Sequence, residues 1–470
     1  MDANHFPLTP IIHPWVHDFL EQKEAIYAAI AQHGSPINVH NMTPFDENLS
    51  AFKKTFDSYG LKSKIFFARK ANKCKFLVEQ AQQLNHGVDT ASYMELKQAL
   101  EVGVPAANLV CTAAVKNRKL IALAIEAQVP LVLDNEDECT LIQTVAEEMN
   151  TTVPIQVRLS GFIVAQQLLP SRFGFERKKA YALITESLGK DKQFDRLLYQ
   201  GLHFHLNGYS IPQRAISLHQ CFDLVAELKA DGIPTKSVDF GGGILINYLK
   251  DRKEWEAFQE ALKEAVLHKR EALTFQNDGL GLMNIEGRLY FDMQVYPYYN
   301  EVNKTTFLEQ ILTFQGDGPK NIFQRALEQD IELRIEPGRS SLDQVGITIA
   351  KVAFRRYHTD GQLLIGLEMN RTQLRSASAD FLLDPIHISQ GEAAKGESCE
   401  GYLVGAYCLE QELILKRKLY FHQLPQVDDL FVFINTAGYM MHFYESEAHL
   451  FPLAKNFVYH TAHKMLEARD

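Results

Sequence analysis

The sequence predicts an α/β chain in which a (β/α)8 barrel is followed by a second, all-β domain. Eight short apolar runs lie between residues 65 and 335, helical patterns fill most of the gaps, and no antiparallel hairpin signal interrupts them. From about Gln344 onward the pattern changes to β-rich segments without long helices. Eight strands separated by helices favour a closed barrel, because a doubly wound open sheet, the alternative, more often has fewer strands.

Composition excludes several classes of protein. The 470 residues allow two or three domains, and the 58 acidic residues outnumber the 48 basic ones without a basic patch, so a nucleic-acid partner is not expected. The six cysteines are scattered without metal-ligand spacing, which predicts reduced thiols, no metal site and a cytoplasmic protein. No apolar run approaches the roughly 18 residues that a membrane span needs, so no membrane contact is expected.

Three parts are expected along the chain. Residues 1–35 form an N-terminal segment with one helical pattern, Val16–His33, that is expected to pack on the β domain. Residues 36–343 form the barrel and residues 344–470 the β domain. The eight predicted barrel strands are Ile65–Ala68, Gly87–Asp89, Leu109–Thr112, Leu131–Leu133, Ile155–Leu159, Leu202–Leu206, Val238–Phe240 and Leu333–Ile335.

A long span, 244–332, separates the last two barrel strands and exceeds an ordinary loop. It contains helical patterns and an aromatic-rich segment with Tyr290, Phe291, Tyr296, Tyr298 and Tyr299. Two interpretations remain open, namely extra core packed on the flank of the barrel and a lid over its mouth.

The β domain is expected to contain four strand-like segments and one short helix at its end. The strands are Ile347–Phe354, Leu363–Glu368, Leu413–Phe421 and Leu430–Ile434, and the helix lies near Ala462–Ala468.

Unusual polar residues follow the predicted barrel strands. Because the carboxyl ends of barrel strands meet at one rim, these residues are expected to converge there. In strand order they are Lys70, Asp89, Arg158, His205, Gly241–Gly243 and Glu336-Pro-Gly-Arg339.

Together these residues predict a phosphorylated aldehyde held as a Schiff base, namely pyridoxal phosphate (PLP). An amine at a strand end can attack a carbonyl, and Lys70 is such an amine. The loops after the last two strands of a barrel are a recurrent phosphate site, since glycine lets backbone N–H groups approach oxygen and arginine adds a bidentate charge. Taken alone, Gly241–Gly243 and Glu336–Arg339 are ordinary turn sequences.

The order and spacing of eight stretches resemble the fold-type III PLP enzymes, the diaminopimelate, ornithine and arginine decarboxylases. The resemblance covers about residues 36–445 and is that of an outlying branch. The stretches are Phe67–Asn72, Gly87–Glu95, Ser171–Gly174, Gly201–His205, Val238–Gly243, Glu336–Arg339, Gly405–Cys408 and Asn435–Tyr439.

The resemblance implies a role for each matching residue. Lys70 would form the Schiff base, His205 would stack on the cofactor ring, and Asp89 and Arg158 would orient Lys70 and the ring hydroxyl. The remaining cofactor-binding residues, on the phosphate side, would be Gly241, Gly242, Gly243, Gly338, Arg339 and Tyr439.

Glu336 and Cys408 would select the reaction. A carboxylate at Glu336 would keep the pyridine nitrogen protonated, which favours decarboxylation over racemisation. Cys408 resembles the family's proton donor, contributed across a homodimer interface, and Cys399 is its rival.

Departures from the family pattern leave the substrate open. Leu409 stands where the family places an acid that binds a distal amine, so a basic substrate is less expected unless Glu410 turns inward. After His205 the usual Gly-Ser is replaced, and Ser210 or a backbone N–H would substitute. Arg371 and Asp384 are weaker candidates for substrate contacts.

The predicted function is decarboxylation of an α-amino acid or of a conjugate bearing one, as in siderophore or other specialised metabolism. A PLP-dependent racemase or epimerase, and a non-catalytic PLP-binding regulatory homologue, are the alternatives. The expected partners are a small-molecule substrate and a second copy of the chain.

Overall fold

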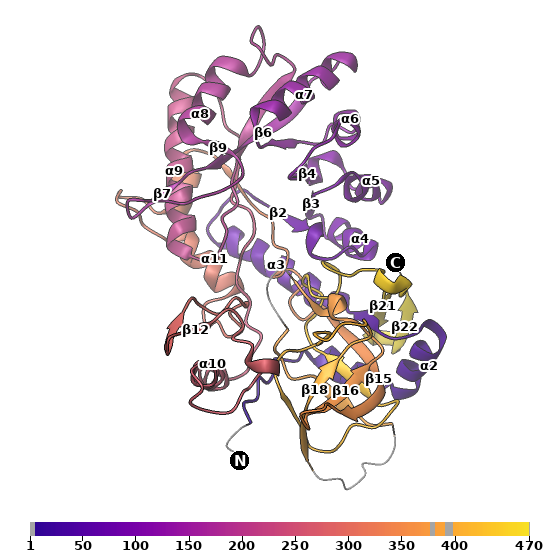
Figure 1. The fold of residues 1–470 in the computed structure, drawn as a ribbon. Coiled ribbons are helices and arrows are strands. Elements are labelled where there is room, and N and C mark those ends of the chain that lie inside the picture. Colours follow the sequence, from indigo (N-terminus) through magenta and orange to yellow (C-terminus); the bar gives the residue numbers. More distant parts are fainter. Residues whose placement is uncertain (1–4, 377–380, 391–397, 470) are drawn as a thin grey trace. The chain divides into compact units, whose positions relative to one another are not determined.

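The chain divides into two compact units. A computed structural model describes residues 5–376, 381–390 and 398–469 (Figure 1). The barrel unit comprises residues 46–245 and 302–341, and the β unit comprises residues 1–45, 246–301 and 342–470.

The barrel unit contains a closed barrel of eight parallel strands, which confirms the predicted fold class. Each strand pairs with its neighbour in parallel register, and pairing of the last strand in the order below, β6, with the first, β10, closes the ring. In spatial order the strands are β10 (Leu197–His203), β11 (Ser237–Asp239), β14 (Glu332–Ile335), β2 (Ser63–Ala68), β3 (Gly87–Thr90), β4 (Leu109–Cys111), β5 (Leu131–Leu133) and β6 (Val153–Ser160).

Helices follow the strands, and Figure 1 shows α4, α5 and α6 along the outer side of β3 and β4. The helices α5, α6 and α7 each begin at a side chain that caps the first turn. These side chains, Ser92, Asn117 and Asn135, each accept a hydrogen bond from a backbone N–H three residues later. The helices are α3 (Met42–Ser58), α4 (Lys75–Gln83), α5 (Tyr93–Glu101), α6 (Arg118–Glu126), α7 (Glu136–Glu148), α8 (Arg177–Ala182), α9 (Ile211–Ala230), α11 (Lys304–Leu312) and α12 (Ile322–Glu328).

The β unit is built on a nine-stranded, largely antiparallel sheet. Its first strand is β1, Ile37–His40, which pairs with β15 and β21. The predicted boundary at residue 36 was therefore wrong, because this strand belongs to the β unit and not to the barrel. The other strands are β15 (Gly346–Tyr357), β16 (Leu363–Leu367), β17 (Ile386–Ile388), β18 (Cys399–Val404), β19 (Leu419–Phe421), β20 (Leu430–Phe433), β21 (Lys455–His460) and β22 (Met465–Ala468).

The N-terminal segment forms two helices instead of the single predicted one. They are α1 (Pro14–Leu20) and α2 (Lys23–His33), and Gln22 between them has a non-helical backbone. Trp15, Phe19 and further apolar side chains of both helices share one buried core with β1, β15, β20 and β21. Burial against the sheet therefore orders this segment.

The long insertion divides between the two units. Residues 246–301 belong to the β unit and 302–341 to the barrel unit, so the assignment of the whole span to the barrel domain was wrong. Phe275 packs on Tyr402 with ring centroids 5.4 Å apart, and the Tyr298 hydroxyl accepts a hydrogen bond from the Leu382 N–H at 3.1 Å. The insertion contributes α10 (Arg252–Val266) and the hairpin of β12 (Met283–Ile285) and β13 (Arg288–Tyr290).

Two predictions near the C-terminus need correction. The expected helix at 462–468 is a turn followed by β22, which pairs antiparallel with β21. Within the expected strand 413–421, only Leu419–Phe421 is a strand. Cross-strand pairing outweighs the local helical pattern at the first place. No helix among the described residues is long and apolar enough to cross a membrane.

Candidate active site

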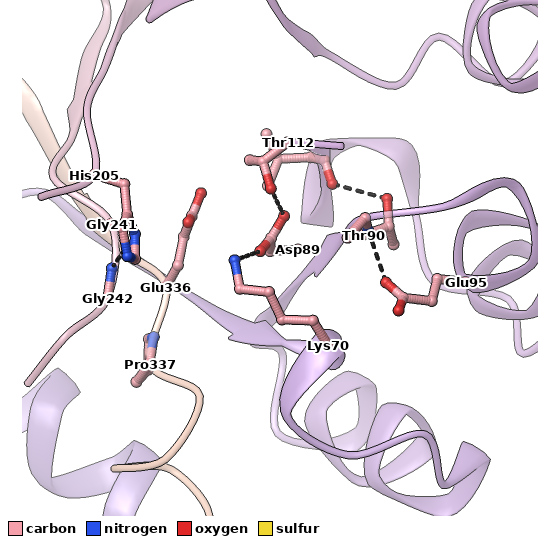
Figure 2. A network of polar contacts seen from close by, with 12 residues as sticks. Lys70, Asp89, Thr90, Glu95, Thr112, His205, Gly241, Gly242, Glu336 and Pro337 are labelled. Atoms are coloured by element: carbon pink, nitrogen blue, oxygen red, sulfur yellow. Dashed lines mark hydrogen bonds and ion pairs between the residues drawn. The ribbon is translucent and has the colours of Figure 1, made fainter. Parts of the chain in front are cut away.

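Lys70 lies where β2 ends, in a single helical turn, Arg69–Ala71. Its Nζ is 3.3 Å from Oδ2 of the buried Asp89, at the end of β3, and 31% of its side chain is exposed. Thr112 donates a hydrogen bond to the other carboxylate oxygen of Asp89 (Figure 2). Burial raises the pKa of Asp89, and the Glu336 carboxylate adds to this effect while Lys70 opposes it. Lys70 is thus an accessible amine held by a fixed carboxylate.

Glu336 follows β14 and is buried inside the barrel. Its Oε1 is 3.1 Å from His203 Nε2, on β10. Burial raises the pKa of Glu336, while Lys70 and Arg158 lower it. In Figure 2 the side chains of Glu336 and Lys70 extend toward the same space at the strand ends. The amide of Ala68 donates to the Pro337 carbonyl at 3.2 Å, which ties the ends of β2 and β14 together.

His203 and Asp239 were not predicted as site residues. The ligand atoms of His203, Asp239 and Glu336 lie within 4.8 Å of one another, and both His203 Nδ1 and Asp239 Oδ2 are buried without a hydrogen-bond partner. A sequence signal for His203 existed, because alternate residues of a strand face the same side and His205 stands two positions later. For Asp239 the signal was its position at the end of the seventh barrel strand.

The glycine loop after β11 packs closely against His205. The Gly242 N–H donates to His205 Nδ1 at 3.2 Å, so the ring of this half-buried histidine has a fixed orientation. Burial, reinforced by the Lys70 charge, keeps the pKa of His205 well below its ordinary value. A Cβ at Gly241 would come within 2.6 Å of His205 Nδ1, and one at Gly242 within 2.5 Å of the Glu336 carbonyl oxygen. Only glycine fits these positions.

Arg158 lies on β6, between an acid and an aromatic ring. Its Nε is 3.9 Å from Asp134, and its guanidinium lies 4.3 Å from the centroid of Phe173. Asp134 also accepts a hydrogen bond from the Gly174 N–H at 2.7 Å. Burial lowers the pKa of Arg158, and the charges of Asp134, Glu336 and Asp89 oppose that shift.

The remaining phosphate-side candidates in the barrel unit occupy two turns. The Ser341 hydroxyl donates to the Gly338 carbonyl at 2.7 Å, and Arg339 between them is half-buried. Ser210, considered as a phosphate contact, instead accepts a hydrogen bond from the Gln213 N–H at 3.3 Å and caps α9.

The other predicted site residues belong to the β unit. Cys408 and Glu410 are exposed, whereas Cys399 is partly buried in β18. Tyr439 is half-buried and adopts a positive φ of 73°.

Arg371 and Asp384 have structural partners within the β unit. Arg371 Nε lies 3.3 Å from the buried Glu412, and Asp384 pairs with Arg417 and accepts the Leu8 N–H at 2.8 Å. These contacts explain both side chains without a substrate, so their substrate roles stay predictions.

Comparison with known proteins gives concordant results. A family model described as "Pyridoxal-dependent decarboxylase, pyridoxal binding domain" matches residues 43–290, more than half of the chain. The protein named "Uncharacterized protein y4yA" of Sinorhizobium fredii is 27% identical over 460 residues, which cover 96% of this chain and 93% of that protein. Diaminopimelate decarboxylase of Campylobacter jejuni is 28% identical over 239 residues, which span 48% of this chain and 58% of that enzyme.

Solved structures share the fold over nearly the whole chain. Diaminopimelate decarboxylase from Helicobacter pylori, complexed with L-lysine, superimposes with a TM-score of 0.70 at 18% identity, covering 94% of this chain and 95% of that one. Lysine/ornithine decarboxylase from Vibrio vulnificus, complexed with putrescine, gives a TM-score of 0.67 at 17% identity, covering 96% and 100%. At this identity the structures establish the fold alone.

The residues at the strand ends fit PLP. The amine of Lys70 is accessible, and the N–H of Gly243 in the glycine loop donates to no described residue. Glu336 presents a buried carboxylate, which suits the ring nitrogen of such a ligand.

Proposed function

Since the chain belongs to the pyridoxal-dependent decarboxylase family, we propose that it uses PLP to remove the α-carboxylate of an amino acid or of a larger molecule carrying one. The observation that supports this most directly is the buried Glu336 carboxylate, which faces the same space as the Lys70 amine. When bound, PLP supplies a protonated ring that accepts the electron pair released as the carboxylate leaves as CO₂.

Lys70 would hold the cofactor through its amine. Asp89 keeps the Lys70 Nζ at the strand ends, and Thr112 prevents the Asp89 carboxylate from rotating away. The amine therefore has little freedom before the cofactor binds, which reduces the entropy lost on binding.

Glu336 would hold a proton at the ring nitrogen. The His203 imidazole donates to Oε1 of Glu336 and leaves the second oxygen for the ring. Burial raises the pKa of Glu336, whereas the charges of Lys70 and Arg158 lower it and favour the ionised carboxylate that would keep a ring nitrogen protonated.

His205, Gly241–Gly243 and Arg339 would bind the rest of the cofactor. The neutral ring of His205 suits stacking on an aromatic ligand, since it adds no charge that would repel a protonated ring. The Gly241 and Gly242 N–H groups already donate to Asp239 and His205, so the Gly243 N–H and the guanidinium of Arg339 are the groups that suit a phosphate.

Cys408 would return a proton to the substrate carbon, acting in the site of a second copy of the chain. Next to Cys408, the buried Tyr407 ring lies 5.1 Å from His449 and 6.1 Å from Phe451, and its hydroxyl donates to the Ser446 carbonyl at 3.1 Å. The β unit exposes the apolar side chains Leu409, Phe443, Tyr444, Leu450, Phe451 and Leu453. A homodimer would cover side chains of this kind. Cys408→Ala should retain the cofactor and lose turnover, and the same change at Cys399 is the matched control.

The substrate proposal is an α-amino acid without a required distal amine, or a conjugate from siderophore or other specialised metabolism. Leu409, 53% exposed, follows Cys408 and offers no charge to an ammonium group. The diaminopimelate and lysine/ornithine decarboxylases named above define the reaction class to test first.

The test is mass spectrometry of amino acids and amino-acid conjugates after incubation with the protein and PLP in heavy water. Loss of CO₂ with one deuterium gained supports the proposal. Deuterium uptake at Cα without loss of CO₂ would instead identify a racemase or epimerase. PLP binding without any change in these compounds would favour the non-catalytic alternative.

A further inference from the structure

Arg214 is a buried cation without an acidic partner. It lies in the first turn of α9, only 1% of it is exposed, and its Nε has no hydrogen-bond partner. Among the described residues it forms no ion pair with any carboxylate. Burial lowers the pKa of Arg214 to about 10, so the guanidinium is still charged at neutral pH. A buried charge without a counter-ion is strongly unfavourable unless a ligand supplies one.

Three other buried or half-buried cations of the barrel unit are paired with an acid, whereas the buried Arg69 donates to the Glu95 and Lys73 carbonyls and to Gln98. Lys116 contacts Glu138 at 3.0 Å, Arg158 contacts Asp134 at 3.9 Å, and Arg325 contacts Asp223 at 2.7 Å. Arg214 is thus the exception among these four, although it is the least exposed of them.

The position of Arg214 in the first turn of α9 is also electrostatically unfavourable. The first turn of a helix carries a partial positive charge, and that of α9 has no acidic residue. A guanidinium at this end adds to the same positive charge, and an anion there would neutralise both.

The guanidinium contacts two glycine-containing loops. Nη2 of Arg214 donates to the Gly208 carbonyl at 2.7 Å and to the Gly242 carbonyl at 3.3 Å. Gly243 has a positive φ of 76°, and a Cβ there would collide with the same nitrogen. These contacts occupy carbonyl oxygens of both loops and leave the amide N–H groups of Gly208 and Gly243 for other partners.

We propose that Arg214 is a further phosphate-binding residue of the cofactor site, where its guanidinium neutralises the phosphate and fixes the loop 241–243. This inference rests on PLP as the cofactor and adds a residue that the glycine and Glu336–Arg339 motifs did not indicate. A phosphate dianion is the anion expected at a glycine loop joined to a helix N-terminus and a buried arginine.

The experiment compares PLP with pyridoxal, which lacks the phosphate, as ligands of the apoprotein. For Arg214→Gln, the dissociation constant of PLP should rise about 10- to 100-fold, the effect of losing one or two hydrogen bonds to a charged group. The dissociation constant of pyridoxal should be unchanged. Arg214→Lys, which keeps the charge, should recover part of the loss for PLP.

Arg325→Gln is the matched control, because Arg325 also packs against α9, donating to the His219 carbonyl at 3.1 Å, but is paired with Asp223. It should leave both constants unchanged. Equal weakening of PLP and pyridoxal by Arg214→Gln would show that Arg214 only shapes the loop and would overturn the proposal, as would an unchanged PLP constant.

Two further outcomes separate this inference from the proposed function. If the wild-type protein binds PLP but decarboxylates nothing, the proposed function fails and the test of Arg214 still stands. If Arg214→Gln does not fold, inorganic phosphate should raise the melting temperature of the wild-type apoprotein relative to chloride at equal ionic strength. Absence of that rise would overturn the proposal.

Discussion

Two sets of buried polar side chains in the barrel unit differ in how completely they are hydrogen-bonded. Lys116 Nζ donates to both carboxylate oxygens of Glu138, at 3.0 and 3.1 Å, and to the Ala113 carbonyl at 2.8 Å. In the cluster of His203, Asp239 and Glu336, two buried atoms have no partner. An unpartnered buried polar atom costs about 1–3 kcal/mol, so the second arrangement is retained for a reason other than stability. We infer that the complete pair, Lys116 and Glu138, serves the fold and that the incomplete cluster of His203, Asp239 and Glu336 serves a ligand.

The largest expected effect concerns Lys70, at the proposed cofactor site. Lys70→Ala should lower turnover by at least about 10³-fold, because it removes the amine that would hold the cofactor covalently. The absorbance band of the protein-linked cofactor should also disappear while the melting temperature changes little. Lys64→Ala, a half-buried lysine in β2, the strand that precedes Lys70, is the control and should keep the band. A band that persists without Lys70 would remove this residue from the site.

Disrupting the pair of Lys116 and Glu138 should affect stability instead of activity. Lys116→Met would leave the Glu138 carboxylate buried without a counter-ion and should destabilise the apoprotein by about 3–5 kcal/mol in urea unfolding. The double variant Lys116→Met/Glu138→Leu should recover most of this loss, since no unpaired charge remains. An equal loss in both variants would mean that packing, and not charge, accounts for the effect.

His203 tests whether the incomplete cluster acts on the ligand. His203→Leu should lower kcat about 10-fold, because Glu336 loses a hydrogen bond of about 1.5 kcal/mol to its charged form. The ¹⁵N chemical shift of the labelled cofactor ring nitrogen should move toward the deprotonated form. His203→Gln, which can still donate a hydrogen bond, should restore both readouts. A shift that stays constant in the Leu variant would limit His203 to a structural role.

The smallest effect is expected for Asp239. Burial and the Glu336 charge raise the pKa of Asp239 well above its ordinary value, so the folded protein binds its proton more tightly than the unfolded chain. Wild-type stability therefore falls as the pH rises from the unfolded pKa, about 4, toward the folded one. Asp239→Asn should make the apoprotein more stable by about 1 kcal/mol at neutral pH, and this gain should vanish near pH 4. A gain independent of pH would contradict the assignment.

Local sequence patterns were sufficient for the barrel and its rim. Seven of the eight barrel strands were predicted to within two residues, because apolar runs between amphipathic helices are local signals. The prediction of Leu202–Leu206 for the sixth strand was wrong in its bounds, since β10 spans Leu197–His203. Lys70, Asp89, His205 and Glu336 could be assigned to one rim, because parallel strands all end on the same side.

Long-range pairing decided the rest. Nothing local in Ile37–His40 shows that it pairs with Ile347 and its neighbours, more than 300 positions away, and residues 246–301 join the β unit only through contacts such as Phe275 with Tyr402. Likewise His203 meets Glu336 across 133 positions, and Arg214 lacks an acid only because of what surrounds it once folded. Sequence alone determined the elements and the side of the barrel that carries the chemistry. Burial and partners, which set charge and proton affinity, depend on contacts between distant segments and are decided by the tertiary structure.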